Sequence, residues 1–373
     1  MKPETLAIHH TKDSTEEIKA VSSSIHLSTT YLRNEDGRFT NDYRYSRLDN
    51  PNRRQLEKSL AILEKGEVAY TFSSGMGAIN AVFQSLKSGD HILIPDDVFF
   101  NVHMLLNDVF NRWNLRLTKV DMSDLEDVSK AIQSNTKLIW IETPSNPLLK
   151  VINIEAIVKI AKSNNIRVGV DNTWLTPVLL NPIELGVDIV MHSTTKYFGG
   201  HSDVMGGCLV LKKNNELSEK IKQIQLLSGA VPSPFDCWLI IRGIKTLPLR
   251  IKEQSKSAEK LANYLESHPK IKKVNYPGLK NNAQYEISKK QMKNGYGAML
   301  SVLISGNKNT AISISNNLKL FTTATSLGGV ESLIEHRESV EGPHTTTPDN
   351  LLRISVGLEH IDDLIADWEQ ALE

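Results

Sequence analysis

The stretch VDIVMHSTTKYFGG, residues 187–200, combines the end of a strand with a group of reactive side chains. Its first five residues, 187–191, form an apolar run that predicts a short buried strand. Lys196 follows this strand, between the hydroxyl groups of Ser193–Thr195 and the Gly199–Gly200 turn. A lone lysine is usually a solvated surface charge. Its meaning therefore depends on what else ends at the same edge of the sheet.

Short apolar strands alternate with helical segments on both sides of this stretch. We expect strands over 68–72, 91–95, 137–141, 167–170, 187–191 and 208–212, and helices over 53–64, 75–86, 103–113 and 154–163. This alternation is typical of βαβ units in a doubly wound, mostly parallel sheet, so the fold class is α/β. In such sheets the ligand lies at the carboxyl ends of the strands.

The alternation of short strands and helices ends after the predicted sheet. One long helix is expected over 234–265, and the strands that follow are typical of a smaller α+β domain; we expect them over 272–276, 298–304 and 351–357. The chain then divides into an N-terminal segment (1–43), a large domain (44–245) and a C-terminal domain (246–373). The first segment is polar and irregular, which is typical of a flexible tail or of an arm ordered by a partner subunit.

Composition excludes several classes of protein. The 373 residues carry 43 Lys+Arg and 43 Asp+Glu, and a net charge of zero argues against binding to nucleic acid or to an acidic membrane. Forty per cent hydrophobic and 23% charged residues are typical of a soluble globular protein. Two cysteines cannot form a disulfide framework or a CxxC metal site, and no apolar leader or membrane span is visible. We therefore expect a cytoplasmic protein without a metal.

A glycine-containing turn follows the strand at 68–72. Ser73-Ser74-Gly75-Met76-Gly77 opens a predicted helix, whose unpaired N–H groups and positive dipole end favour a phosphate. Asn80 stands where a dinucleotide fingerprint needs its third glycine, so a Rossmann site is disfavoured. A turn that only connects strand to helix is the alternative.

Carboxylates follow two other strands. Glu142 and Asn146 belong to a loop that Pro144 and Pro147 make rigid, and Asp171 comes directly after the strand at 167–170. A carboxylate at the end of a buried strand is costly unless a cation meets it, or unless it only caps a turn. Together, a phosphate cradle, a strand-end carboxylate and a lysine match the needs of pyridoxal 5'-phosphate (PLP).

Seven motifs carry a resemblance that runs nearly end to end. They are YSRLDNP (45–51), SSGMGA (73–78), IETPSNPLLK (141–150), VDNTWLTP (170–177), HSTTKYFGGHSDV (192–204), SLGGVESL (326–333) and LLRISVGLE (351–359). In these motifs and their order the chain resembles the Cys/Met-metabolism (trans-sulfuration) family of PLP enzymes, the relatives of cystathionine γ-synthase, γ-lyase and β-lyase. The resemblance implies the PLP fold-type I, or aspartate-aminotransferase-like, fold.

The resemblance also implies roles for individual residues. The catalytic residues would be Lys196, which forms the Schiff base and moves protons, Asp171, which pairs with the pyridine nitrogen, and Phe99. The cofactor would be held by Tyr45, Arg47, Gly75, Met76, Phe99, Asp171, Ser193, Thr195 and Lys196. The substrate would be held by Glu142, Asn146, Ser326 and Arg353, with Arg353 on its α-carboxylate.

Shared active sites are a further implication. Tyr45 and Arg47 would reach the phosphate of the neighbouring subunit, so the resemblance implies a homo-oligomer that is at least a dimer. Within this family we expect a tetramer. The N-terminal segment 1–43 would then be an arm that contacts that subunit. The remaining partner would be a small sulfur amino acid, the substrate.

Three positions depart from the family pattern. Phe99 replaces a ring-stacking tyrosine, so it can stack but has no phenol to exchange a proton. Thr325 stands where several relatives that handle cystathionine carry glutamate. A charged segment, residues 335–343, replaces a Thr-His-Ala-Ser stretch and suggests an altered substrate choice.

The leading hypothesis is a PLP-dependent C–S lyase or γ-replacement transferase that makes or breaks a C–S bond of a sulfur amino acid. Within the family, SLGGVESL favours γ-synthase or γ-lyase chemistry, and a cystathionine or cysteine-conjugate β-lyase is the alternative. A PLP-binding relative with little catalytic activity is the alternative from another class. A nucleotide-dependent oxidoreductase is the remaining alternative.

Overall fold

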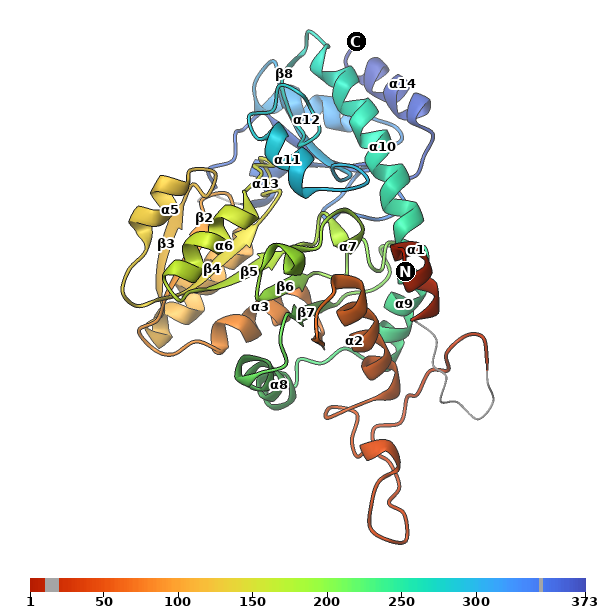
Figure 1. Cartoon of the computed structure of the whole chain (residues 1–373). Coiled ribbons are helices and arrows are strands. Elements are labelled where there is room, and N and C mark those ends of the chain that lie inside the picture. Colours follow the sequence, from red (N-terminus) through yellow and green to blue (C-terminus); the bar gives the residue numbers. More distant parts are fainter. Residues whose placement is uncertain (11–19, 342–344) are drawn as a thin grey trace.

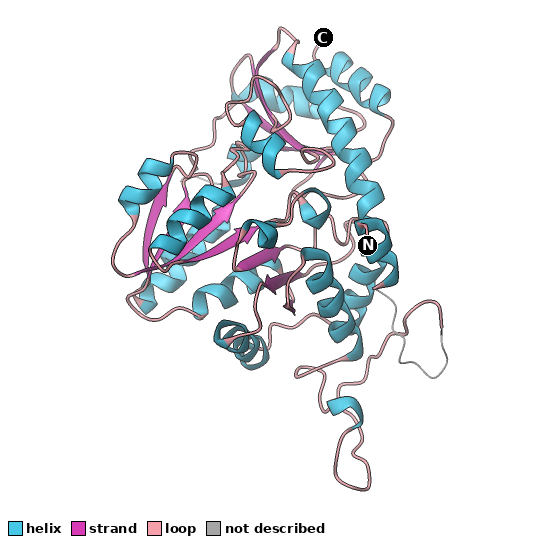
Figure 2. Ribbon diagram, in the orientation of Figure 1, coloured by secondary structure: helices cyan, strands magenta, loops and turns pink. Residues whose placement is uncertain are grey.

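Two sheets organise the chain, and each draws on a different part of the sequence (Figure 1, Figure 2). The structure is a computed structural model that describes residues 1–10, 20–341 and 345–373. The larger sheet has seven strands in the order β1-β7-β6-β5-β4-β2-β3. Its strands are β1 (Val68–Phe72), β2 (His91–Pro95), β3 (Arg116–Val120), β4 (Thr136–Glu142), β5 (Arg167–Asp171), β6 (Ile189–His192) and β7 (Gly207–Leu211).

Only β7 runs against its neighbours in this sheet. It pairs antiparallel with both β1 and β6, whereas the pairs from β6 to β3 are parallel. The predicted doubly wound, mostly parallel sheet is therefore confirmed. The edge strand β3 was not predicted, because its sequence RLTKV has three polar residues among five and forms no apolar run.

The large sheet is buried on both faces. Along β4, Ile139 and Ile141 enter one hydrophobic cluster, while Leu138 and Trp140 enter another on the opposite face. This is the alternation that a two-sided burial requires. The helices that accompany the sheet are α2 (Pro51–Glu64), α3 (Gly75–Gln84), α4 (Phe100–Met104), α5 (Leu125–Ala131), α6 (Ile154–Ser163), α7 (Thr176–Leu179) and α8 (Glu216–Ser228).

The smaller sheet has five strands in the order β10-β11-β12-β9-β8. They are β8 (Ile271–Asn275), β9 (Met299–Ile304), β10 (Thr322–Thr323), β11 (Leu333–His336) and β12 (Leu351–Ser355). The helices of this part are α11 (Tyr285–Gln291), α12 (Lys308–Asn317), α13 (Arg337–Glu341) and α14 (Ile361–Ala371). In Figure 1 this sheet packs above the large one, and the carboxyl ends of β4, β5 and β6 face it.

The predicted single helix over 234–265 is wrong: the structure has α9 (Pro234–Ile244) and α10 (Leu247–Glu266). Pro248 has no N–H to donate to the carbonyl of Ile244, so one continuous helix would lose a hydrogen bond there. The predicted helix over 103–113 is also only partly right. Most of that stretch is a π-helical turn, Leu105–Val109, followed by a 3₁₀ turn, Phe110–Trp113.

The N-terminal part of the chain lies in two places. The short helix α1 (Pro3–His9) packs against α2 and α10, and Ala7 is buried there. Residues 20–50 form an irregular extension, with one 3₁₀ turn (Thr40–Asp42), that projects away from the body (Figure 1). Residues 11–19 of the predicted arm lie outside the described residues. Among those described, no helix combines the length and apolarity needed to cross a bilayer.

Candidate active site

A cavity of about 430 Å³ lies between the two sheets, at the carboxyl ends of β4, β5 and β6. It is lined by eleven of the thirteen predicted site residues: Gly75, Met76, Phe99, Glu142, Asn146, Asp171, Ser193, Thr195, Lys196, Ser326 and Arg353. They come from segments far apart in the chain, so the fold itself assembles them. A second hollow of about 360 Å³ lies at the opposite, amino ends of β4, β5 and β6 and is lined by none of these residues.

Lys196 lies in the turn that joins β6 to the antiparallel β7. Its Nζ donates a hydrogen bond of 2.6 Å to the hydroxyl oxygen of Ser326. Burial, helped by the positive charge of Arg353, lowers the pKa of Lys196 to about 8. An amine with this pKa has a substantial neutral fraction at pH 7 to 8 and can act as nucleophile and base.

Ser326 adopts a backbone conformation that side chains other than glycine avoid, with φ at 89°. Such a conformation costs about 1–3 kcal/mol and is retained only where the surroundings enforce it. Here the residue contacts Lys196 through its hydroxyl and accepts a hydrogen bond from the guanidinium of Arg353 through its carbonyl. Ser326 thus joins the lysine and the arginine of the site.

Asp171 and Glu142 lie side by side, because they are register partners at the ends of β5 and β4. Asp171 accepts a hydrogen bond of 2.9 Å from the backbone N–H of Thr173. Burial raises the pKa of both carboxyl groups, and the charge of Asp171 raises that of Glu142 further. A carboxylate at the position of Asp171 fits a protonated ring nitrogen, which would supply the missing positive charge.

The start of α3 forms a cradle on the wall of the same cavity. Ser74 caps the helix by accepting a hydrogen bond from Gly77 N–H, and the N–H groups of Gly75 and Met76 have no carbonyl one turn earlier to bind. A Cβ on Gly75 would lie 2.9 Å from the Cβ of Ser193, so only glycine lets the backbone approach this serine. The helix start and the serine hydroxyl together fit a phosphate group.

Thr195 lines the same cavity, but its hydroxyl already has two partners. It donates to the carbonyl of Gly206 and accepts from the N–H of the same residue. These bonds tie the lysine turn to the start of β7. A direct bond from Thr195 to a phosphate stays a prediction.

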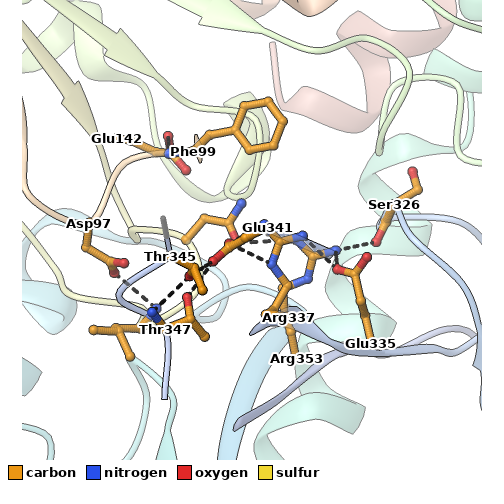
Figure 3. A network of polar contacts seen from close by, with 12 residues as sticks. Asp97, Phe99, Glu142, Ser326, Glu335, Arg337, Glu341, Thr345, Thr347 and Arg353 are labelled. Carbon is orange, nitrogen blue, oxygen red and sulfur yellow. Dashed lines mark hydrogen bonds and ion pairs between the residues drawn. The ribbon is translucent and has the colours of Figure 1, made fainter. Parts of the chain in front are cut away.

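Phe99 contributes its ring to the cavity wall and its backbone to Glu142. The N–H of Phe99 donates a hydrogen bond of 2.8 Å to Glu142 Oε2 (Figure 3). We therefore assign Glu142 a positioning role, because its bond is made to the chain that carries the aromatic ring. Glu142 also lines the cavity, and its predicted contact with the substrate stays a prediction.

Asp97 holds the loop that carries Asn146. Its half-buried carboxylate accepts hydrogen bonds from the hydroxyl of Ser145 and from the N–H of Leu148. Burial raises the pKa of Asp97 to about 6. Asn146 itself accepts a bond of 3.2 Å from Arg353 Nη1, so the loop reaches the predicted carboxylate-binding arginine.

Arg353 is buried on β12 and already paired. Its Nη2 lies 2.6 Å from Glu335 Oε2, and Glu335 is its cross-strand partner on β11. Burial, together with the positive charge of Arg337, lowers the pKa of Arg353 to about 10. An incoming carboxylate would therefore meet an arginine that is fixed in place by a glutamate, a serine carbonyl and an asparagine.

Arg337 and Glu341 also line the cavity, and sequence reasoning did not assign them a role. Arg337 bonds to Glu335 through Nη1 and to Glu341 through Nε and Nη2, and its side chain is only 6% exposed (Figure 3). The available signal was the departure over residues 335–343, of which 342 and 343 lie outside the described residues. A run of charges of this kind normally indicates a solvated surface.

Tyr45 and Arg47 are the two predicted residues that the cavity does not contain. Tyr45 is 46% exposed, and the guanidinium of Arg47 lies over its ring. Arg47 also donates a hydrogen bond of 2.7 Å to the carbonyl of Leu226, outside the cavity. In a single chain these residues belong to the projecting extension rather than to the site.

The fold and the cavity define a PLP-binding enzyme of the α/β class. Comparison with known proteins agrees: the family described as Cys/Met metabolism PLP-dependent enzyme matches residues 4–373. The chain belongs to this family, and it is a PLP-dependent C–S lyase or transferase.

Named relatives cover nearly the whole chain. The cystathionine gamma-synthase of Mycobacterium tuberculosis (H37Rv) is 43% identical over 99% of this chain and 96% of its own length. The cystathionine gamma-lyase of Bacillus subtilis (strain 168) is 44% identical and covers 100% of both chains. The crystal structure of metB from Corynebacterium glutamicum matches with a TM-score of 0.96 and 42% identity, over 100% of this chain and 98% of that one. Other relatives bear the name cystathionine beta-lyase.

Proposed function

We propose that the enzyme acts at the γ-carbon of a sulfur amino acid, as a cystathionine γ-synthase or γ-lyase does. The observation that carries this proposal is the position of Lys196, whose Nζ is 2.6 Å from Ser326 Oγ and whose pKa is lowered by burial to about 8. γ-Chemistry needs two successive proton removals, from Cα and then from Cβ, and one mobile amine can perform both.

The remaining residues hold the substrate around that amine. PLP, when bound, withdraws electrons from the substrate and so makes its Cα and Cβ protons acidic. Arg353 and Asn146 would bind the α-carboxylate and thereby hold Cα next to Lys196. Because Phe99 has no phenol, both proton transfers fall to Lys196, and Ser326 orients its Nζ.

The names of the relatives support this proposal. Synthases and lyases that bear the prefix gamma match the chain at 43–44% identity. Since beta-lyases match at 41–44%, identity by itself does not choose between the two reactions. The choice depends on which bond of the substrate breaks.

A product assay tests the proposal directly. Purified protein with PLP is incubated with cystathionine, and the products are separated and quantified. γ-Cleavage gives cysteine, 2-oxobutyrate and ammonia, whereas β-cleavage gives homocysteine, pyruvate and ammonia. O-Acetyl-homoserine with cysteine tests the synthetic direction, since γ-replacement yields cystathionine and acetate. Homocysteine and pyruvate as the only products would overturn the γ proposal and establish a β-lyase.

The assembly and location are part of the proposal. We propose a homo-oligomer in which Tyr45 and Arg47 complete the phosphate site of a neighbour. It is at least a dimer, and we expect a tetramer. Their exposed position on the extension supports this arrangement. Cys208 and Cys237 are both free and buried, which suits the cytoplasm that we propose as the compartment.

A further inference from the structure

Arg337 and Glu341 sit on the short helix α13, on the wall of the cavity that carries Arg353. Both are charged and almost inaccessible to solvent, with side chains 6% and 7% exposed. Val340, between them, also lines the cavity and is 51% exposed. The cavity therefore continues beyond the α-carboxylate arginine into a region with one cation, one anion and one apolar side chain.

We propose that Arg337 and Glu341 bind the far end of the substrate when that end is itself an amino-acid zwitterion. Arg337 would hold the distal carboxylate and Glu341 the distal ammonium group. The substrate class is thus a thioether that joins two amino acids, and the inference rests on the proposed function for the reaction at the near end.

The contacts of Arg337 allow a distal carboxylate to replace Glu341 as its partner. Its Nη1 donates to Glu335 Oε2 at 2.8 Å, which anchors the guanidinium from one side. Its Nε and Nη2, the edge that binds a carboxylate with two parallel bonds, face Glu341 Oε1 at 3.1 and 2.5 Å. A distal carboxylate can take the place of Glu341 on this edge while Arg337 stays anchored.

Glu341 has an anchor of its own as well. Its Oε2 accepts hydrogen bonds from the hydroxyl groups of Thr345 and Thr347. Burial would raise the pKa of Glu341, but these hydroxyls and the charge of Arg337 outweigh it and hold the pKa below its usual value. When its Oε1 leaves the arginine, the two hydroxyl groups still hold Oε2, so the carboxylate stays in place to face an ammonium group.

The charges balance only for a zwitterion. A distal ion pair replaces the internal Arg337–Glu341 pair by two new pairs, so no buried charge loses its partner. A distal group with a carboxylate alone would satisfy Arg337 but leave Glu341 facing a like charge. This pair also supplies an anion for a distal amine in a chain that has Thr325, rather than glutamate, on the cavity wall.

The test compares three substrates that share the near end. Cystathionine carries the distal zwitterion, O-succinyl-homoserine a distal carboxylate, and an S-ethyl thioether no distal charge. If the enzyme cleaves at Cγ, the thioether is S-ethyl-homocysteine. If it cleaves at Cβ, the thioether is S-ethyl-cysteine, and O-succinyl-serine takes the place of O-succinyl-homoserine. Product identity therefore tests the proposed function, while the ratio between substrates tests the distal site.

Arg337→Met is expected to lower kcat/KM for cystathionine about 10- to 100-fold, mainly through KM, because a charged hydrogen-bond partner is lost. Glu341→Gln is expected to do the same for cystathionine but to leave O-succinyl-homoserine unchanged or improved. Turnover of the S-ethyl thioether should stay within about two-fold in both variants, which shows that the site is folded.

Glu338→Gln is the matched control, because it removes the same charge from the same helix at a surface pair with Lys308. It should leave all three substrates unaffected. An equal loss for every substrate in the two variants would show that the pair only holds the wall together. No loss for cystathionine would place its distal group elsewhere. Either result overturns the proposal.

Discussion

Glu142 and Asp171 are register partners on β4 and β5, and together they place two carboxyl groups at one edge of the large sheet. Glu142 is buried and Asp171 half-buried, and the pKa of Glu142 is raised by burial and by the charge of its neighbour. Two neighbouring carboxylates shielded from water in this way do not both ionise readily. We infer that Glu142 holds a proton while Asp171 keeps the charge that a pyridinium ring needs.

This inference predicts opposite outcomes for two isosteric changes. Glu142→Gln mimics the protonated acid and keeps an oxygen for the N–H of Phe99, so cofactor content and turnover should remain close to those of the parent. Asp171→Asn removes the charge opposite the ring nitrogen and should lower kcat about 100-fold or more. Absorbance of bound PLP and steady-state rates measure both. Similar losses in the two variants would contradict the assignment.

Lys196 should control how PLP attaches to the cofactor-free protein. Only the neutral amine attacks an aldehyde, and the pKa of Lys196 is lowered to about 8, so the rate of PLP attachment should rise with pH and level off above about pH 8. Arg353 contributes to the lowering, so Arg353→Met should move the rise to higher pH. Lys196→Ala should abolish covalent attachment and turnover. Stopped-flow absorbance follows the attachment, and turnover by Lys196→Ala would refute the site assignment.

Substitutions of Phe99 test whether its ring contributes to PLP binding by stacking alone. Phe99→Ala should weaken PLP binding about three- to ten-fold, since an aromatic contact contributes about 0.5–1.5 kcal/mol beyond its buried area. Phe99→Tyr should bind PLP as the parent does, because the backbone bond to Glu142 does not depend on the ring. Titration of cofactor-free protein with PLP gives both affinities. A large loss in Phe99→Tyr would show that the cavity has no space for the phenol.

Arg47 provides a test of shared sites. Arg47→Ala and Lys196→Ala are each expected to be nearly inactive, the first because it lacks the phosphate contact and the second because it lacks the reactive lysine. If Arg47 serves the neighbouring subunit, a mixed dimer contains one site with both residues intact. Random mixing of equal amounts should then restore about a quarter of the parent activity. Refolding the two variants together and separately measures this, and no recovery would place Arg47 in the site of its own chain.

Much of the fold could be predicted from short apolar runs. The strands at 68–72 and 91–95 match the structure residue for residue, and those around Lys196 differ from it by one or two residues at their ends. Gly75, Glu142, Asp171, Ser193 and Lys196 were predictable because each lies at or just after the end of a predicted strand, where ligands bind in such sheets. Tyr45, Arg47, Phe99, Ser326 and Arg353 were named only through the family resemblance. The break between α9 and α10 was missed because the pattern on either side is equally helical.

The charged wall of the cavity could not be predicted. β11 is only four residues long and reads Leu-Ile-Glu-His, which gives no clear strand signal. Glu335 and Arg337 can be buried because Glu335 pairs with both Arg337 and Arg353, and Arg337 pairs in addition with Glu341. The pairing across β11 and β12 is invisible in a linear sequence. A charge run by itself predicts the opposite, a solvated loop.

The lysine turn begins and ends in the same sheet, since β6 leads into it and β7 returns from it. Lys196, Asp171 and the helix start at Gly75 therefore form a unit that the large sheet holds by itself. Thr325, Arg337, Glu341 and Arg353 come from the other sheet or the segments around it. Selection, natural or in the laboratory, can therefore exchange Thr325, Arg337 and Glu341 to retarget the enzyme, while Lys196, Asp171 and the start of α3 are inherited intact.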